Sequence, residues 1–253
     1  MAKILAVHAH PDDVEHLCAG TLAVLAAKGH TIAIATLTAG ECGSDRTDLA
    51  ATAAIRKAEA ARAAALIGAE YACADLPDLG VYIDDRARRA TTELIRRAGA
   101  EIVLAPSPAD YHPDHEAASQ LVRDACFAAS VPNYATGTAA PLQAIPHLYF
   151  VDPIGGRDRE GHPIIPEFGC ALGEAFATKR AMLACHESQA EWVARQHGIA
   201  DHLASMETWT RRRGADFGVA AAEGFRQYRH QPYPRTPRLQ ELLGEALVAP
   251  TKA

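Results

Sequence analysis

Residues 4–22 read ILAVHAHPDDVEHLCAGTL, an apolar run followed by a polar cluster and then an amphipathic segment. The β-prone run at 4–7 predicts a strand, which ends before Pro11 because proline cannot donate a hydrogen bond to a neighbouring strand. From Leu17 onward, leucine and alanine recur at helical spacing. The loop between strand and helix carries the polar residues His10, Asp12 and Asp13. Ligands of open parallel α/β sheets bind beyond the carboxyl ends of strands, so we expect a functional site at this loop.

The same order of strand and helix continues through residues 3–129. Strands are expected at 3–8, 31–37, 70–74 and 101–105. Helices are expected at 17–28, 50–67, 84–98 and 114–129. This alternation predicts an α/β fold, a Rossmann-like, doubly wound and mostly parallel sheet with helices on both faces. Right-handed crossovers then bring the loops that follow these strands to one edge of the sheet.

The second half of the chain has a less regular pattern. Its predicted elements are a loop at 130–146, a strand at 147–152, helices at 172–186 and 188–212, a helical turn within 215–225 and a surface tail at 229–238. Glycine and proline punctuate residues 153–169. Because long irregular loops are usually functional, we expect segment 130–170 to form part of a cleft wall and to set substrate preference. We interpret residues 1–253 as one domain, with an α/β core at 1–129 and the cleft wall and C-terminal helices at 130–253.

Composition excludes several classes of protein. With 49% apolar residues, the 253-residue chain can bury a substantial core without disulfides. A formal net charge of −6 argues against a nucleic-acid partner. The six cysteines are scattered without a C-x-x-C pair, the N-terminus leads directly into a strand, and no apolar stretch is long enough to span a bilayer. We therefore expect a cytoplasmic protein without a membrane span.

Two loops after predicted parallel strands carry metal-ligand residue types, His10-x-x-Asp13 and His112-x-x-His115. A catalytic zinc ion needs three protein ligands and an open position for water. The first loop can supply a nitrogen and an oxygen, and the second loop another nitrogen, which suits Zn²⁺ or another divalent metal such as Fe²⁺. Asp12 would remain free to take a proton from water. The alternative is that Asp12, Asp13 and Asp114 merely cap helices, but capping alone does not explain two such loops at equivalent strand ends.

The segment Ala9-His10-Pro11-Asp12-Asp13, together with His112-Pro113-Asp114-His115, resembles the PIG-L (LmbE-like) zinc deacetylase family. Members of this family remove the acetyl group from N-acetylglucosaminyl compounds. Weaker likeness extends over nearly the whole chain, through residues 37–41, 56–68, 75–78, 186–189 and 222–225. Val14 stands where many members have glutamate, and Ala19 replaces the first glycine of a usual pair.

The resemblance implies a role for each polar residue of the two loops. It makes His10, Asp13 and His115 the metal ligands and Asp12 the general base. It makes His112 the group that stabilises the oxyanion or protonates the leaving amine, with Asp114 orienting it. It also places Arg56 near the sugar, and Glu41 can line the cleft because it follows a strand. The implied substrate is a small N-acetylated amino sugar or its conjugate.

Several alternatives stay open on the sequence. The same site can serve a zinc-dependent amidase of another small amide, such as a thiol conjugate, or a hydratase. A non-catalytic sugar- or nucleotide-binding module has less support, because no G-x-G-x-x-G follows the first strand. His8 should point away from His10 and be packed or hydrogen-bonded, whereas the pattern leaves the roles of His16, Cys18 and His186 undecided. Alanine-rich helices offer flat faces, so we also expect homo-oligomers.

Overall fold

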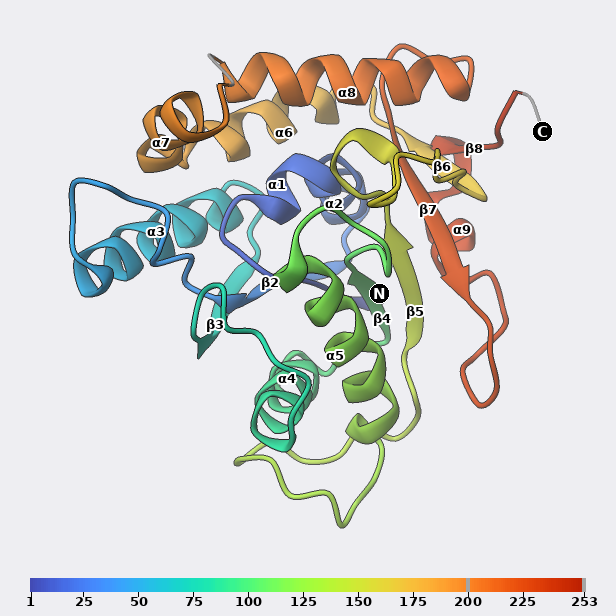
Figure 1. Cartoon of the computed structure of the whole chain (residues 1–253). Helices are drawn as coiled ribbons and strands as arrows, with labels where there is room; N and C mark the ends of the chain where they lie inside the picture. Colours follow the sequence, from blue (N-terminus) through green and yellow to red (C-terminus); the bar gives the residue numbers. More distant parts are fainter. Residues whose placement is uncertain (199–200, 252–253) are drawn as a thin grey trace.

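The computed structural model describes residues 1–198 and 201–251. Within them, β-strands form one sheet of eight strands in the order β3-β2-β1-β4-β5-β7-β6-β8. The first five strands in that order run parallel, and β7, β6 and β8 continue the sheet with antiparallel pairing. The predicted α/β fold class is confirmed. Figure 1 shows the arrangement.

The parallel part is built from strands and helices that alternate along the chain. Its strands are β1 (Lys3–His8), β2 (Thr31–Thr38), β3 (Glu70–Leu76), β4 (Ile102–Ala105) and β5 (His147–Val151). Its helices are α1 (Asp13–Leu17), α2 (Ala19–Ala27), α3 (Leu49–Ala65), α4 (Asp85–Ala98) and α5 (Pro113–Ala129). The strand order reverses direction between β1 and β4, and such a switch point is where open α/β sheets bind ligands.

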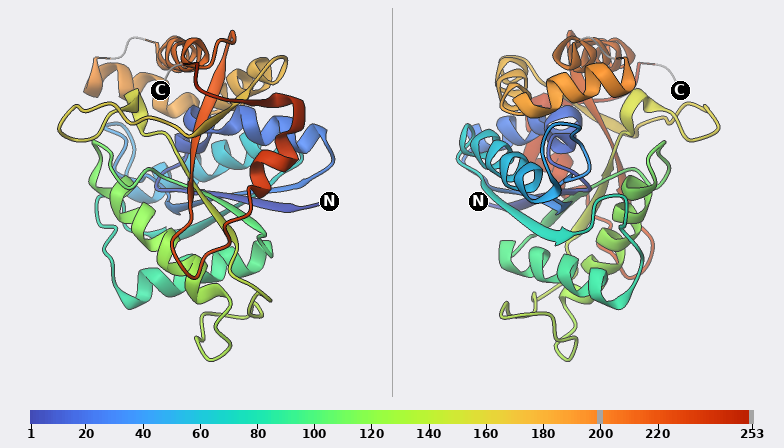
Figure 2. Two further views of the ribbon diagram at one scale, coloured as in Figure 1. Left: turned by 90° about the vertical axis from the view of Figure 1, so that its right-hand side faces the viewer. Right: turned by 60° about the vertical axis from the view of Figure 1, so that its left-hand side comes forward.

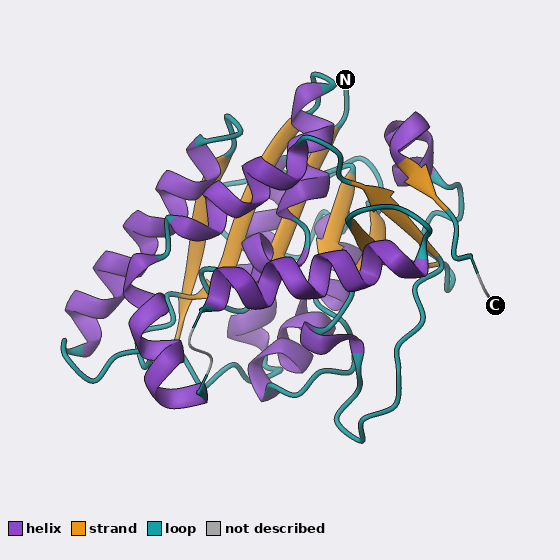
Figure 3. Cartoon of the chain, turned by 90° about the horizontal axis from the view of Figure 1, so that it is seen from above, coloured by secondary structure: helices purple, strands orange, loops and turns teal. Residues whose placement is uncertain are grey.

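The C-terminal part adds an antiparallel edge and a second layer of helices. It comprises η1 (Ile154–Gly156), β6 (Phe168–Ala171), α6 (Ala175–Ala184), α7 (Glu187–His197), α8 (His202–Asp216), β7 (Ala222–Tyr228), α9 (Arg238–Leu243), η2 (Gly244–Ala246) and β8 (Leu247–Val248). Figure 2 shows α6, α7 and α8 stacked beyond α1 and α2, on the side of the sheet opposite α4 and α5. Figure 3 shows the strands lying side by side between helices.

Alternate residues of β1 supply two hydrophobic cores. Ile4 and Ala6 pack with α1, α2, α6 and α9 on one face, whereas Leu5 and Val7 pack with α4 and α5 on the other. A central strand covered on both faces needs apolar residues at every position, which explains the uninterrupted run in the sequence. Burial on both faces also holds the carboxyl end of β1 rigidly in place. None of the described helices has the length and apolar character that a membrane span requires.

Three sequence expectations about elements are corrected by the structure. The helix predicted at 17–28 is α2, and a separate short helix, α1, precedes it and ends at Leu17, just before Cys18, where φ is −143°. The helix predicted at 188–212 is α7 followed by α8, and Asp201 caps α8 by accepting a hydrogen bond from the Ala204 N–H. The helical turn expected at 215–225 is wrong, since β7 begins at Ala222 and pairs with β5 and β6. Its strand conformation depends on partners distant in the sequence, which local pattern does not reveal.

Candidate active site

The loops after β1 and β4 meet at the switch point of the sheet. Ile4 and Ala6 of β1 pair in parallel with Ile102 and Leu104 of β4, so the two strands end at the same edge. His10 lies between β1 and α1, Asp13 begins α1, and His115 lies in the first turn of α5. Residues more than a hundred positions apart are thereby brought together, as the sequence predicted for neighbouring strand ends.

His10, Asp13 and His115 form a compact triangle of ligand atoms. His10 Nδ1 lies 3.3 Å from Asp13 Oδ2 and 3.3 Å from His115 Nε2, and Asp13 Oδ1 lies 3.3 Å from His115 Nε2. Atoms bound to one tetrahedral zinc ion at about 2.0–2.1 Å are about 3.3 Å apart, so the spacing of the three side chains suits such an ion, with Asp13 facing His10 through Oδ2 and His115 through Oδ1. The exposed fractions of the three residues are 8%, 5% and 1%. The residues present therefore fit a small divalent metal.

A second set of polar groups holds these three side chains. His10 Nε2 lies 3.1 Å from Asp78 Oδ1 and 3.4 Å from Asp114 Oδ2. His115 Nδ1 lies 3.2 Å from Asp110 Oδ2, and His8 Nδ1 lies 2.7 Å from Asp13 Oδ2. Carboxylates behind metal-binding imidazoles orient the rings and increase their basicity. Sequence reasoning did not single out Asp78 or Asp110, although each lies in a loop that follows a strand.

The pKa values in this cluster show that its carboxylates favour a cation. Burial raises the pKa of Asp13, but His115 and His8 outweigh burial and hold it well below its usual range. Burial lowers the pKa of His115, but Asp13 and Asp110 outweigh it and raise that pKa to about 9. In the chain alone, protons on imidazole balance the buried carboxylates. A divalent metal at the triangle would supply the same positive charge, which agrees with the chemistry of the ligand set.

Asp12 and Asp13 point in different directions. Asp12 adopts φ 95° and ψ −24°, a left-handed conformation that is strained for a non-glycine residue. Its Oδ1 lies 3.4 Å from Arg56 Nη2, and its side chain is 23% exposed. Burial raises the pKa of Asp12, and the Arg56 guanidinium opposes that rise. The backbone turn at Asp12 thus separates the two carboxylates and leaves Asp12 facing the cavity beside the metal triangle.

His112 stands on the other side of the triangle. Its ring centroid lies 4.8 Å from those of His10 and His115. Its Nδ1 accepts a hydrogen bond of 3.1 Å from the Asp114 backbone N–H, so a neutral His112 carries its proton on Nε2. The Asp114 carboxylate instead accepts a 2.8 Å hydrogen bond from the Leu79 N–H and contacts His10. Asp114 therefore meets His112 through its backbone, and its predicted orienting role stays a prediction.

Arg56 and Glu41 tie neighbouring loops to this edge of the sheet. Arg56 Nη1 donates to the Gly40 carbonyl at 2.8 Å, and Nη2 donates to the Pro11 carbonyl at 2.6 Å. A Cβ at Gly40, where φ is +65°, would lie 2.1 Å from Arg56 Nη1, so only glycine fits there. Glu41 Oε1 accepts a 2.9 Å hydrogen bond from the Asp78 N–H. Arg56 also lines the cavity described next, and the substrate-binding roles of both residues stay predictions.

A cavity of about 550 Å³ opens above the metal triangle. One side is formed by the metal-loop residues together with His16, Cys42, Gly43, Arg56, Asp78, Leu79 and Tyr111. The other side is formed by Ile154, Leu183, Gln189, Trp192, Val193, Gln196, His202 and Ser205. The volume lies within the range of about 300–1,000 Å³ that is typical of small-molecule sites.

The cleft wall differs from the one expected at 130–170. Of the described residues in that segment, Ile154 alone lines the cavity. Residues 134–139 instead bind α4, where Thr136 donates to Glu93 at 2.7 Å and Arg96 donates to the Tyr134 carbonyl at 2.9 Å. Figure 1 shows this loop at the far end of α4 and α5. The wall comes mainly from α6, α7 and α8, and the amphipathic pattern of those helices gave no signal of that role.

The residues whose roles the sequence left undecided lie in different parts of the structure. His16 lines the cavity, and burial lowers its pKa to about 3. Cys18 is buried in the core beside α2. His186 is fully buried, with Nε2 3.5 Å from Glu15 Oε1. His8 is buried and hydrogen-bonded, as expected, but the expectation that it points away from His10 is wrong. Its Nδ1 lies 2.7 Å from Asp13 Oδ2, the oxygen that His10 Nδ1 also approaches, because the loop after β1 folds Asp13 back over His8.

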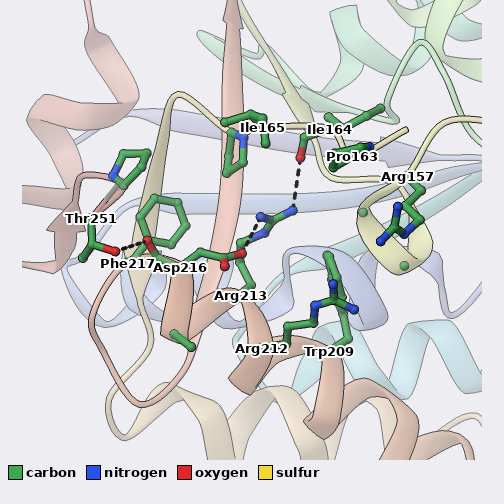
Figure 4. A pocket seen from close by; sticks show the side chains of 15 residues that line it. Arg157, Pro163, Ile164, Ile165, Trp209, Arg212, Arg213, Asp216, Phe217 and Thr251 are labelled. Carbon is green, nitrogen blue, oxygen red and sulfur yellow. Dashed lines mark hydrogen bonds and ion pairs between the residues drawn. The ribbon is translucent and has the colours of Figure 1, made fainter. Parts of the chain in front are cut away.

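A second pocket lies beyond η1, between Gly156 and α8. Figure 4 shows that Arg213 points toward Asp216 and the Ile164 carbonyl, at 2.9 Å and 3.4 Å. Arg213 Nε also donates to Asp152 at 2.6 Å. The described residues that line this pocket include no histidine or cysteine and one carboxylate, Asp216. The metal-triangle cavity is therefore the candidate active site.

Comparisons with known proteins agree with the fold. Residues 5–126 match the family model described as "PIG-L: GlcNAc-PI de-N-acetylase". The matched segment includes the loop after β1 and the loop after β4. The chain is 30% identical over 138 residues to diacetylchitobiose deacetylase of Thermococcus kodakarensis, over 52% of each chain. It therefore matches about half the length of this curated relative.

Solved structures resemble the chain over most of its length. The conserved protein TT1542 of Thermus thermophilus has a TM-score of 0.74 and 29% identity, over 93% of this chain and 100% of its own. N,N'-diacetylchitobiose deacetylase of Pyrococcus horikoshii has a TM-score of 0.76 and 22% identity, over 93% and 87% of the two chains. The hydratase GalB of Pseudomonas putida KT2440 has a TM-score of 0.73 and 22% identity, over 93% and 98%. At 22% identity, the last two show a shared fold.

Proposed function

We propose that this protein is a metal-dependent hydrolase that removes the acetyl group from an N-acetylated amino sugar or its conjugate. The observation that carries the proposal is the 3.3 Å triangle of His10, Asp13 and His115, which lies at the base of a cavity beside a separate carboxylate, Asp12. The PIG-L core and the 30% identity to a diacetylchitobiose deacetylase support the reaction class. Two imidazole nitrogens and one carboxylate oxygen suit zinc, and Fe²⁺ is an alternative.

The residues around the triangle can complete an amide hydrolysis. A divalent metal held by His10, Asp13 and His115 would supply Lewis-acid chemistry that acidifies water and polarises a carbonyl. Asp12 takes a proton from the attacking water, whose oxygen forms a bond to the acetyl carbon. His112 donates from Nε2 to the negative charge that develops on the carbonyl oxygen. The C–N bond then breaks, and the leaving amine receives its proton from Asp12 or His112, releasing acetate and the free amino sugar.

Acetate release tests the reaction. Protein treated with a chelator should lose its activity on N,N'-diacetylchitobiose and N-acetylglucosamine, and one equivalent of Zn²⁺ should restore it. Stoichiometric metal without acetate release from any N-acetylated sugar would contradict the proposal. Full activity in metal-free protein would contradict the metal dependence.

Two other reactions use the same groups. A thiol-conjugate amidase would release a carboxylic acid from a different amide, and a hydratase would add water to a double bond without releasing acetate. The pair Asp12 and Asp13 favours hydrolysis, because one carboxylate binds metal and the other remains a base. A substrate panel that contains a thiol-conjugate amide and an unsaturated acid separates these reactions.

The proposal includes a cytoplasmic setting and self-association. Six free cysteines agree with a reducing compartment, and exposed apolar side chains such as Tyr82 and Phe127 agree with contacts between copies. Sedimentation at micromolar concentration should show a species larger than the monomer, and a monomer alone would reject self-association.

A further inference from the structure

We propose that Trp192, Gln196, His202 and Ser205 form a binding wall for a neutral pyranose ring, and that the cavity selects against sugars that carry a phosphate or carboxylate. These four residues of α7 and α8, called here the sugar wall, line the same cavity as the metal-loop residues. The inference rests on the proposed function, because it assigns the remainder of the same substrate.

The first argument is the charge of the cavity lining. Among the described residues that line the cavity, Arg56 is the one arginine or lysine. Its Nη atoms are occupied by the carbonyls of Gly40 and Pro11 and by Asp12. Three carboxylates, those of Asp12, Asp13 and Asp78, line the same space. The described lining thus offers an anionic substrate group no free guanidinium or ammonium with which to pair.

The second argument is that one polar atom of the sugar wall, His202 Nε2, lacks a partner among the described residues. His202 Nε2 is buried and makes no hydrogen bond within the described part of the chain. The hydrogen bonds of α7 and α8 to their surroundings come instead from neighbouring residues such as Gln189, which donates to the Gly43 carbonyl at 3.2 Å. Buried polar groups are nearly always paired, so a ligand that brings hydroxyl groups into the cavity explains the unpaired His202 nitrogen.

The third argument is the combination of an indole with neutral hydrogen-bonding groups. One face of a pyranose ring presents C–H groups, and its rim presents hydroxyl groups that both donate and accept. Trp192 supplies apolar surface with a single N–H donor, and Gln196 and Ser205 each supply a donor and an acceptor. The wall therefore suits a sugar ring better than a purely apolar or an ionic ligand.

Kinetics on matched tryptophan variants test the wall. Trp192→Ala should raise KM for N,N'-diacetylchitobiose about tenfold, which corresponds to about 1.4 kcal/mol, with kcat changed less than about threefold. Trp192→Phe should retain most of the affinity, because a ring remains. Trp209→Phe is the matched control, since Trp209 lines the second pocket and should leave both constants unchanged. An unchanged KM in Trp192→Ala would contradict the proposal that the sugar wall binds the substrate.

A binding measurement separates this inference from the deacetylase proposal. The chain has two tryptophans, so in Trp209→Phe the fluorescence reports Trp192 alone. Titration with N-acetylglucosamine should give a saturable change, and His202→Ala in that background should weaken it. A saturable change without acetate release from any sugar would overturn the deacetylase function but support the wall. Acetate release without any fluorescence change would support the function and overturn the wall.

A charged substrate tests whether the cavity selects against anionic sugars. N-acetylglucosamine 1-phosphate should have a kcat/KM at least tenfold below that of N,N'-diacetylchitobiose and should change the Trp192 fluorescence less than N-acetylglucosamine does. Equal or higher kcat/KM for the phosphate would overturn the selection against anions.

Discussion

The two sides of the cavity differ in how their polar groups are satisfied. On the metal side, His10 and His115 contact Asp13, and Asp78, Asp110 and Asp114 lie behind the imidazoles. On the α7 side, helix contacts point outward: Ser188 donates to Glu59 at 2.6 Å, and Arg195 pairs with Asp45 at 2.7 Å. Of the sugar-wall atoms, His202 Nε2 is buried and has no partner in the described part of the chain. Substitutions on the metal side should therefore alter metal binding and turnover. Substitutions on the α7 side should alter the affinity for the sugar.

The largest effect is expected when the Asp13 carboxylate, which His10 and His115 share, is removed. Asp13→Ala should abolish both metal binding and activity, because Asp13 contacts both imidazoles of the triangle. Metal content measured by atomic spectroscopy checks this. Asp158→Ala, in an exposed group with Glu160 and His162, should leave metal content unchanged. Stoichiometric metal in Asp13→Ala would show that the triangle is not the site.

Replacing Asp12, the acid next to Asp13, tests whether the two carboxylates have different roles. Asp12→Asn should keep metal and fold but lower kcat by about 10²–10⁴-fold, because an amide cannot accept the proton of water. Activity of the parent protein should rise with pH through the pKa of Asp12, which burial places above the ordinary range. Loss of metal in Asp12→Asn, with retention in an inactive Asp13→Asn, would exchange the two roles.

A smaller effect is expected behind the metal ligands. Asp78→Asn removes a carboxylate 3.1 Å from His10 Nε2 and should weaken metal affinity by about 10–100-fold. Competition with a chelator of known affinity measures this change. Asp75→Asn is a control at the end of β3, three residues before Asp78, because Asp75 pairs with Lys57 at the surface. An equal loss of affinity in both variants would attribute the effect to the loop conformation.

The smallest effect on activity is expected for Glu93, which lies away from both sides of the cavity. Glu93 accepts hydrogen bonds from Thr136, Arg97 and the backbone of Ala139, and its side chain is 12% exposed. Glu93→Gln should lower the free energy of unfolding by about 1–3 kcal/mol at pH 7 and leave kcat/KM within about twofold. Chemical denaturation measures the first quantity, and a loss of activity beyond tenfold would show that residues 134–139 influence the cavity.

The difference in free energy of unfolding between the parent protein and Glu93→Gln should decrease as the pH falls. Burial raises the pKa of Glu93, but its hydrogen bonds with Thr136 and Arg97 outweigh burial and lower the pKa to about 2, from an ordinary 4.5. The ionised form is thus favoured in the folded state, and its contribution to stability is complete above pH 4.5. As pH falls from 4.5 toward 2, this contribution is lost, so the parent and Glu93→Gln should converge.

The metal loops could be predicted from sequence because their signals are local. A buried parallel strand that ends in His10-Pro11-Asp12-Asp13 places those side chains at a sheet edge, whatever the rest of the chain does. Strand β7 could not be predicted, because residues 222–228 become a strand only through pairing with β5 and β6. The strand-end sequence similarly did not reveal Asp78 and Asp110, whose contacts with His10 and His115 depend on the packing of separate loops.

The sequence alone therefore determined the α/β class and the position of the two polar strand-end loops, since hydrophobic periodicity and strand-end residues are properties of short segments. Tertiary structure alone decided which helices line the cavity and which polar groups are left unpaired. Residues 134–139 and the α7–α8 segment both lie in the less regular second half of the sequence, yet one binds α4 and the other lines the cavity. That difference arises because burial against distant elements, rather than local composition, determines where a side chain points.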